Sequence, residues 1–246
     1  MNDHSDSTSP SAPTGTTILR AGVEEMETNY WALSVFDLIG CFSTGPTEED
    51  AIAGAGRRIR EYFEWIGKKD GTAEPFEESV QVTIVERHRR TPWPQDTARF
   101  IRAFYEDDAR PLRIWDMDIA LRLLDWSRQD LLQLAGSLLP DSLDQPENEP
   151  RWKTLDGLVG HIWESENAIL GTLDVAVDMI TMPSDSVGRL QAVRERLRSV
   201  LPQWAEAELE REVMGEKWSP RKALRRALWH ERDHVLKWEE LTGRMT

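Results

Sequence analysis

Hydrophobic and polar residues alternate with a period of two in the segment ETNYWALSVFDLIGCFSTG near the N-terminus. One face carries Tyr30, Ala32, Ser34 and Phe36, and the other carries Trp31, Leu33 and Val35. Alternation among aromatic and β-branched residues is typical of strands. We therefore expect two strands joined near residues 37–40, and ILRAGVEEM just before them is a candidate for another.

The period then changes to that of a helix in PTEEDAIAGAGRRIREYFEWIGKKDG. The apolar residues at helical spacing are Ala51, Ile52, Ala55, Ile59, Tyr62, Phe63 and Ile66. Acidic residues at the start and Gly67 and Gly71 near the end fit the two ends of a helix. VQVTIVERHRR, from Val80, returns to alternation. The predicted order is strand, strand, helix, strand.

The run DLIGCFSTG followed by TEEDA at a helix start resembles the HicB-like small α/β fold, over about residues 18–90. In that family the unit is a partner-binding antitoxin or a regulatory module, usually followed by a DNA-binding segment. The resemblance implies a protein partner for this domain. No DNA-binding segment follows directly in this chain, which argues against DNA as that partner.

Residues 91–110 begin with TPWP and are interpreted as an interdomain linker with a helical turn or two. Beyond it every periodic segment is helical. The predicted helices run from Ile114 to about Leu139, from a cap at Thr154 through Leu173, from Ser186 to Met214, and from Ser219-Pro220 to near Gly243. Four amphipathic helices of this length predict an antiparallel four-helix bundle over residues 111–246, and hence an α+β chain.

Two histidines four residues apart, His230 and His234, stand in the sequence WHERDHVLKWEEL of the last helix. Residues at this spacing lie one turn apart, so one divalent ion can contact both imidazoles. The pair shares its predicted face with Ala223, Ala227 and Trp238, and the two alanines are expected to leave a cavity. The alternative interpretation is a surface pair without a ligand.

A third histidine, His161 in GHIWESENAIL, lies at the edge of the apolar stripe of the second helix. Two helices would then supply three imidazoles with open positions, as in catalytic zinc sites. Glu164 and Ser165 follow closely and are candidate proton carriers, and therefore candidate catalytic residues. The alternative is a partly buried core histidine beside two solvated residues.

These helices resemble the DinB/YfiT-like superfamily of four-helix metalloproteins over about residues 111–246. One histidine in the second helix and a pair four apart in the fourth match its metal triad, so the resemblance implies His161, His230 and His234 as ligands. It further implies a zinc or nickel ion, a thiol-dependent transfer, isomerisation or hydrolysis on a small molecule, and often a low-molecular-weight thiol and a homodimer.

The composition of the chain limits the classes of partner that it can be expected to bind. The formal net charge of −14 argues against nucleic acid, and no run of eighteen apolar residues suggests a membrane span. Residues 1–17 are polar, lack the features of a signal peptide and are interpreted as a disordered tail, so we expect a cytoplasmic protein. The single cysteine, Cys41, is expected to be a buried packing residue.

Eleven tryptophans are expected mainly in packing, with Trp163 and Trp238 as candidates for the wall of the metal pocket. Two functional hypotheses stay open. The first is a divalent-metal-dependent thiol transferase or hydrolase. The second is a non-catalytic regulatory or partner-binding protein in which the metal stabilises the helices.

Overall fold

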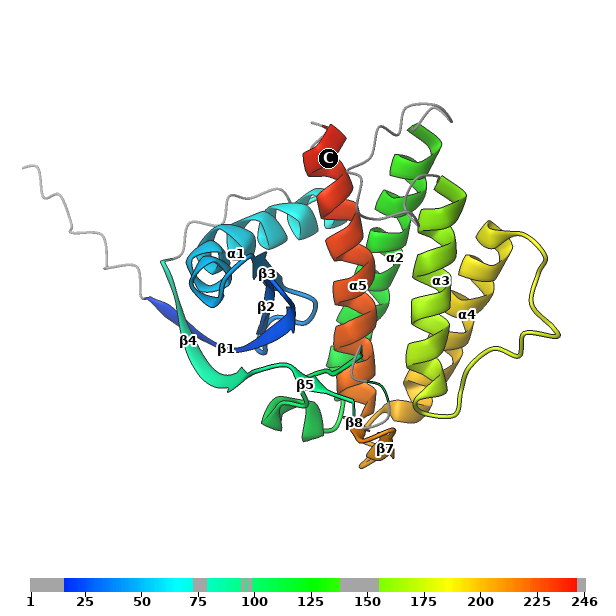
Figure 1. The fold of residues 1–246 in the computed structure, drawn as a ribbon. Coiled ribbons are helices and arrows are strands. Elements are labelled where there is room, and N and C mark those ends of the chain that lie inside the picture. The colour runs from blue at the N-terminus through cyan, green and yellow to red at the C-terminus, as the bar shows by residue number, and fades with distance from the viewer. Residues whose placement is uncertain (1–15, 73–78, 94–95, 97–98, 138–154, 243–246) are drawn as a thin grey trace, which may run out of the picture.

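The computed structural model describes residues 16–72, 79–93, 96, 99–137 and 155–242. Almost all of the predicted tail and the acidic loop DSLDQPENEP fall outside these residues. The chain is of the α+β class, with an N-terminal sheet that carries one helix, followed by a helical domain (Figure 1). Among the described helices, none is long and apolar enough to cross a membrane.

The N-terminal sheet has four strands in the order β3-β2-β1-β4. Its strands are β1 (Thr17–Glu27), β2 (Tyr30–Val35), β3 (Phe42–Gly45) and β4 (Val80–His88). The candidate strand ILRAGVEEM is thus the long strand β1, which pairs antiparallel with β2 and parallel with β4. Strands β2 and β3 are joined through residues 36–41, as the alternation predicts.

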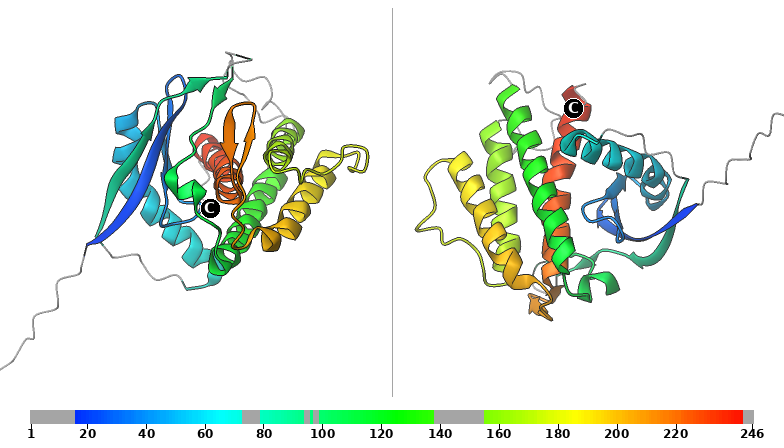
Figure 2. Two further views of the ribbon diagram at one scale, coloured as in Figure 1. Left: turned by 90° about the horizontal axis from the view of Figure 1, so that it is seen from below. Right: turned by 180° about the vertical axis from the view of Figure 1, so that it is seen from behind.

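Helix α1 (Glu48–Asp70) connects β3 to β4 and covers one face of the sheet (Figures 1 and 2). The Thr47 hydroxyl caps its start by accepting a hydrogen bond from the backbone N–H of Asp50, and Gly71 ends it in the left-handed conformation. The apolar side of α1, including Ala55 and Ile59, packs on the alternating residues of the strands. Cys41 is buried in the same cluster, which confirms its role as a packing residue.

The segment between the domains has more structure than the predicted linker. It contains the short strands β5 (Thr91–Pro92) and β6 (Phe100–Ile101), which pair with each other, and the 3-10 helix η1 (Glu106–Ala109). The two prolines of this segment do not indicate the pairing, because it joins residues 91–92 to residues 100–101, which are separated in sequence.

The helical domain contains α2 (Ile114–Ser137), α3 (Leu155–Gly171), α4 (Ser186–Trp204) and α5 (Pro220–Thr242). Three of the four agree closely with the predicted helices. The third does not: α4 ends at Trp204 rather than Met214, and β7 (Arg211–Val213) and β8 (Glu216–Trp218) form a hairpin. Met214 and Gly215 both have positive φ, as the two central residues of a tight hairpin turn require.

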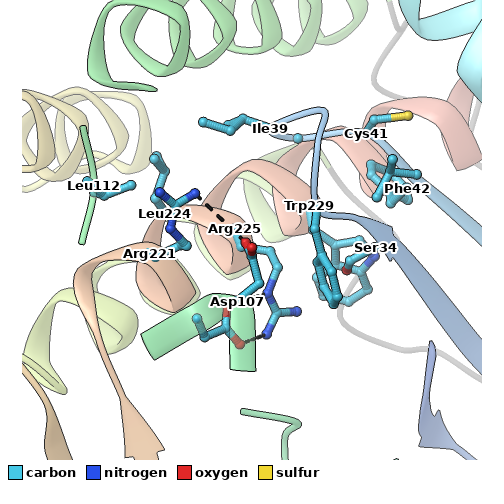
Figure 3. Close-up of a pocket in the computed structure, with 14 residues that line it drawn as sticks. Ser34, Ile39, Cys41, Phe42, Asp107, Leu112, Arg221, Leu224, Arg225 and Trp229 are labelled. Carbon is cyan, nitrogen blue, oxygen red and sulfur yellow. Dashed lines mark hydrogen bonds and ion pairs between the residues drawn. The ribbon is translucent and has the colours of Figure 1, made fainter. Parts of the chain in front are cut away.

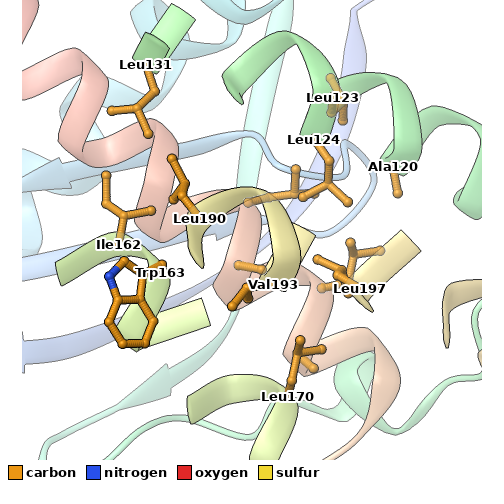
Figure 4. Close-up of a cluster of buried hydrophobic side chains, with 14 of the residues drawn as sticks. Ala120, Leu123, Leu124, Leu131, Ile162, Trp163, Leu170, Leu190, Val193 and Leu197 are labelled. Atoms are coloured by element: carbon orange, nitrogen blue, oxygen red, sulfur yellow. The ribbon is translucent and has the colours of Figure 1, made fainter. Parts of the chain in front are cut away.

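The helices bury one continuous apolar core (Figure 4). Leu123 and Leu124 of α2, Ile162 of α3 and Val193 of α4 are among its members.

Inside this core lies an ionic quartet to which each helix contributes one residue. Its members are Arg128 (α2), Glu166 (α3), Arg194 (α4) and Glu231 (α5). The four ion pairs that join them measure between 2.7 and 3.1 Å. We call this group the core quartet.

The two domains are joined at Asp130 of α2, whose side chain is buried. Its carboxylate accepts hydrogen bonds from Trp65 Nε1 of α1 at 2.7 Å and from the Arg232 guanidinium of α5 at 2.9 Å, and it also binds Lys69 of α1. A buried carboxylate with three donors is well satisfied. This contact fixes α1, and with it the sheet, against the helical domain.

Candidate metal centre

The three histidines predicted as ligands converge at one point between α3 and α5. The Nε2 atoms of His161 and His230 are 3.1 Å apart, and those of His230 and His234 are also 3.1 Å apart. All three candidate ligand atoms lie within 4.8 Å of one another. We refer to these residues as the histidine triad.

The local structure explains this convergence. His230 and His234 follow each other by one turn of α5, so both rings project from the same side of the helix. Helix α3 packs beside α5 and brings His161 close to both histidines, although His161 is 69 residues from His230 and 73 residues from His234 in sequence. His234 is buried, and the other two rings are half-buried.

The electrostatic environment keeps the imidazoles of His230 and His234 neutral. Burial lowers the pKa of His230 well below its usual value of 6.5, and the charges of His161, Arg226, Lys237 and Arg102 lower it further. Burial likewise lowers the pKa of His234, with additional effects from His230 and His161. Neutral imidazole is the form that binds a metal ion.

The triad has the dimensions of a metal site. A tetrahedral ion with bonds of about 2.0–2.1 Å to nitrogen places neighbouring ligand nitrogens about 3.3 Å apart. The two Nε2 separations of 3.1 Å are close to this spacing. Three imidazoles are also a donor set that suits zinc, nickel and related divalent ions. The residues therefore fit a divalent ion.

The triad opens onto a large cleft that is continuous with solvent. One wall consists of α3, α5 and β8 of the helical domain. The other comes from the N-terminal sheet and the interdomain segment, and includes Met26, Tyr30, Arg90, Trp93, Arg99 and Arg102. A site with three protein ligands and an accessible side differs from a closed structural zinc site, which has four.

Comparison with protein families identifies the helical part. Residues 123–236 match the family model described as the DinB superfamily, and this range contains all three histidines. The chain contains a DinB-like domain. No curated protein and no solved structure matched the chain. The family match does not extend to residues 18–90, so the HicB-like resemblance of that region stays a prediction.

The N-terminal domain makes a direct polar contact with the DinB-like domain beside the triad. The Tyr30 hydroxyl of β2 donates a hydrogen bond of 2.8 Å to Asp233, the residue before His234. Asp233 also pairs with Lys237 at 2.9 Å, and the Lys237 ammonium lies 4.2 Å from the centre of the Tyr30 ring. The wall of the cleft is thus fixed by contacts between both domains.

The two candidate proton carriers have different positions in the DinB-like domain. Ser165 lies one turn after His161 on α3 and lines the cleft. Glu164 is exposed and is not among the described residues that line the cleft. The geometry therefore favours Ser165 over Glu164 for contact with a bound molecule.

Several neighbours of the triad differ from those expected. Ala223 and Ala227 are buried in the apolar core and are not among the described residues that line the cleft. Trp163 and Trp238 are buried there too, and the tryptophans that line the cleft are Trp93, Trp218 and Trp229.

The residues missed in the sequence are mainly cations. Arg226 precedes His230 by one turn, and this spacing is a signal that could have identified it. Arg102 lies about 130 residues away along the chain, and no local pattern connects it to the histidines.

Trp229 also borders a smaller pocket between the domains. Figure 3 shows Ile39, Cys41 and Phe42, from the end of the β2–β3 connection and the start of β3, around this pocket, with Leu224 and Trp229 of α5 among its other walls. The residues are mostly apolar and none belongs to the triad. This pocket is a feature of the domain interface, distinct from the metal centre.

Proposed function

We propose that the protein is a divalent-metal-dependent enzyme that acts on a small molecule in the interdomain cleft, as a thiol-dependent transferase or a hydrolase. The observation that carries this proposal is that the triad combines three imidazoles with an open side on a large cleft. A purely structural ion would need neither the opening nor the space beside it.

A divalent ion at the triad would lower the pKa of a bound thiol or water toward neutrality and so supply a nucleophile. The protein's own groups have separate tasks. Trp229 and Phe100 offer apolar surface to the carbon part of a substrate. The hydroxyl of Ser165 is placed to hold or pass a proton in the cleft. Cys41 cannot supply the sulfur, because it is buried in the N-terminal core.

Elemental analysis of untagged protein tests the metal centre. We expect about one divalent ion per chain, the stoichiometry of a single three-ligand site, and its loss in both His161→Ala and His230→Ala. His88→Ala is a matched control, since His88 ends β4 and is not part of the triad. The absence of bound ion from the wild type after incubation with zinc or nickel would refute the metalloenzyme proposal.

A second candidate is a regulatory or partner-binding protein whose ion stabilises the fold. The observation that favours it is that the triad links α3 to α5, so an ion there would cross-link two helices. Turnover separates the candidates. An enzyme loses activity but keeps its fold in His230→Ala, whereas a scaffold loses thermal stability when the ion is chelated and converts no substrate.

A further inference from the structure

Arg226 of α5 is a buried guanidinium with few partners. Its side chain is 11% exposed, lines the cleft and lies one turn before His230. Nη1 is 3.6 Å from the sulfur of Met26 and 3.8 Å from Glu24 Oε1, and the guanidinium carbon is 4.3 Å from the centre of a Trp229 ring. Within the described part of the chain, Arg226 donates no hydrogen bond to an oxygen atom. A guanidinium has five N–H donors, so most of its capacity is unused.

The nearest carboxylate does not compensate for this. Glu24 accepts a hydrogen bond from the backbone N–H of Ala103 at 2.9 Å, and its other oxygen is 3.5 Å from Arg225. The charge of Glu24 is therefore shared. Burial lowers the pKa of Arg226 to about 10, and the like charges of Arg102 and Arg225 contribute. The guanidinium stays charged at neutral pH, and a bound anion would stabilise this poorly paired charge.

A second guanidinium, that of Arg102, reaches the same place from the interdomain segment. It donates to the backbone carbonyl of Met26, and its Nη1 lies 3.9 Å from the Met26 sulfur. Since Arg226 contacts that same sulfur atom, the two guanidinium groups are close to each other. The carboxylate partner of Arg102 is Glu27, which is 3.7 Å away and 65% exposed. Such a pair is weakly held and easily displaced.

We propose that Arg226 and Arg102 form a subsite for a carboxylate of the ligand, beside the histidine triad. The planar guanidinium fork matches a carboxylate in two parallel hydrogen bonds. Arg226, Arg102 and Lys237 all place positive charge near His230, and a divalent ion would add to it. An anionic ligand relieves this field, whereas a neutral one does not. The carboxylate belongs either to the thiol or to a second molecule without sulfur.

This inference rests on the proposed function for the assumption that a thiol binds at the metal ion. Cobalt(II)-loaded protein tests whether the carboxylate belongs to that thiol. Cobalt(II) is used because its thiolate complexes absorb light. The protein is titrated with mercaptosuccinate, a thiol with two carboxylates, and with 2-mercaptoethanol, a neutral thiol. If the carboxylate belongs to the thiol, we expect mercaptosuccinate to bind at least about tenfold more tightly. If it belongs to another molecule, the two thiols bind alike and succinate binds together with 2-mercaptoethanol.

Variants assign the effect to the two arginines. Arg226→Gln is expected to remove most of the preference for mercaptosuccinate, while the affinity for 2-mercaptoethanol changes by no more than about twofold. Arg102 is less buried, and Arg102→Gln is expected to reduce the same preference by a smaller amount. Arg99→Gln is the matched control, because Arg99 lines the same cleft but is 67% exposed and already pairs with Asp96 at 3.4 Å. An equal loss in Arg99→Gln would refute the subsite in favour of the general charge of the cleft.

Metal-free protein separates this proposal from the proposed function. Succinate should raise the unfolding temperature of the metal-free wild type more than its neutral diamide does, and the difference should vanish in Arg226→Gln. This result with no metal binding would refute the metalloenzyme proposal and leave the carboxylate subsite supported. Equal affinities for the two thiols, together with no effect of succinate on loaded or metal-free protein, would overturn the subsite.

Discussion

Helix α5 carries two polar clusters on different faces, and they differ in how completely their charges are matched. In the core quartet, Glu231 and Glu166 each pair with the same two arginines, so two positive charges balance two negative ones. On the cleft face, the described partners of Arg226 are a sulfur atom, a ring of Trp229 and a distant, shared carboxylate. The matched cluster lies inside the DinB-like domain, and the unmatched one lies where a ligand can reach it.

This difference separates two uses of buried charge. A quartet with two positive and two negative charges needs no ligand to balance its charge, and it specifies how four helices meet. The cleft cluster is left incomplete by the protein alone. Charges that are costly to bury and poorly paired are candidates for binding, because a ligand can supply the missing partner.

Removal of one charge from the core quartet should have the largest effect. Glu166→Gln leaves Arg128 and Arg194 with one carboxylate between them, in a fully packed core. We expect the free energy of unfolding to fall by about 3–5 kcal/mol, measured by urea denaturation. Glu164→Gln is the matched control on the same helix; Glu164 is exposed, so its change should stay within about 0.5 kcal/mol. Equal effects would mean that the quartet contributes little.

Acidification of the metal-free protein should have the next largest effect. The folded protein holds His230 and His234 with pKa values well below 6.5, so below that pH the unfolded chain binds more protons. Stability is therefore lost as the pH falls, by about 2 kcal/mol for the pair between pH 6.5 and 5.5. Urea denaturation in a chelator at both pH values measures this. The loss should be smaller in His230→Ala, and an unchanged loss would assign it to other groups.

Removal of the Tyr30 hydroxyl tests the contact between the domains at the cleft. Tyr30→Phe deletes a hydrogen bond to the charged Asp233, and we expect a loss of about 2 kcal/mol in the free energy of unfolding. Tyr62→Phe is a matched comparison, because Tyr62 donates to the neutral carbonyl of Ile39 and should lose about 1 kcal/mol. The opposite order would contradict a charged acceptor at Tyr30.

The smallest effect is expected for an exposed ion pair. Arg57 and Glu61 lie four residues apart on α1 at 2.8 Å, and the arginine is 57% exposed. Arg57→Gln should change the free energy of unfolding by no more than about 0.5 kcal/mol. A loss comparable with that of Glu166→Gln would show that the burial of a charge does not decide its contribution.

The sequence predicts those parts of the structure that depend on local periodicity. The alternation in β4 and the helical spacing of α1 distinguish the more buried side chains from the exposed ones, whereas β2 is buried on both faces. His230 and His234 are predicted because a four-residue spacing determines their relative position within one helix. His161 required a family resemblance as well, since no local rule says which turn of α3 faces which turn of α5.

The parts that could not be predicted depend on distant pairs. Tyr30 and Asp233 are separated by 203 residues, and their contact follows from how the sheet docks on α5. The hairpin β7–β8 is an intermediate case. The segments REV and EKW on either side of Met214-Gly215 are a local signal for this hairpin. The helical spacing of the residues before them favours a longer helix instead, and this is why the predicted helix continues to Met214.

Residues on different faces of α5 contact the core quartet and the cleft, so their function depends on the number of residues that precede them in the helix. Its start is anchored by Ser219, whose hydroxyl accepts a hydrogen bond from the backbone N–H of Lys222. One residue inserted between this anchor and Arg226 would rotate all later side chains by about 100°. Glu231 would leave the quartet, and the histidines would turn away from His161. Insertions and deletions in this stretch should therefore be selected against even where substitutions are tolerated.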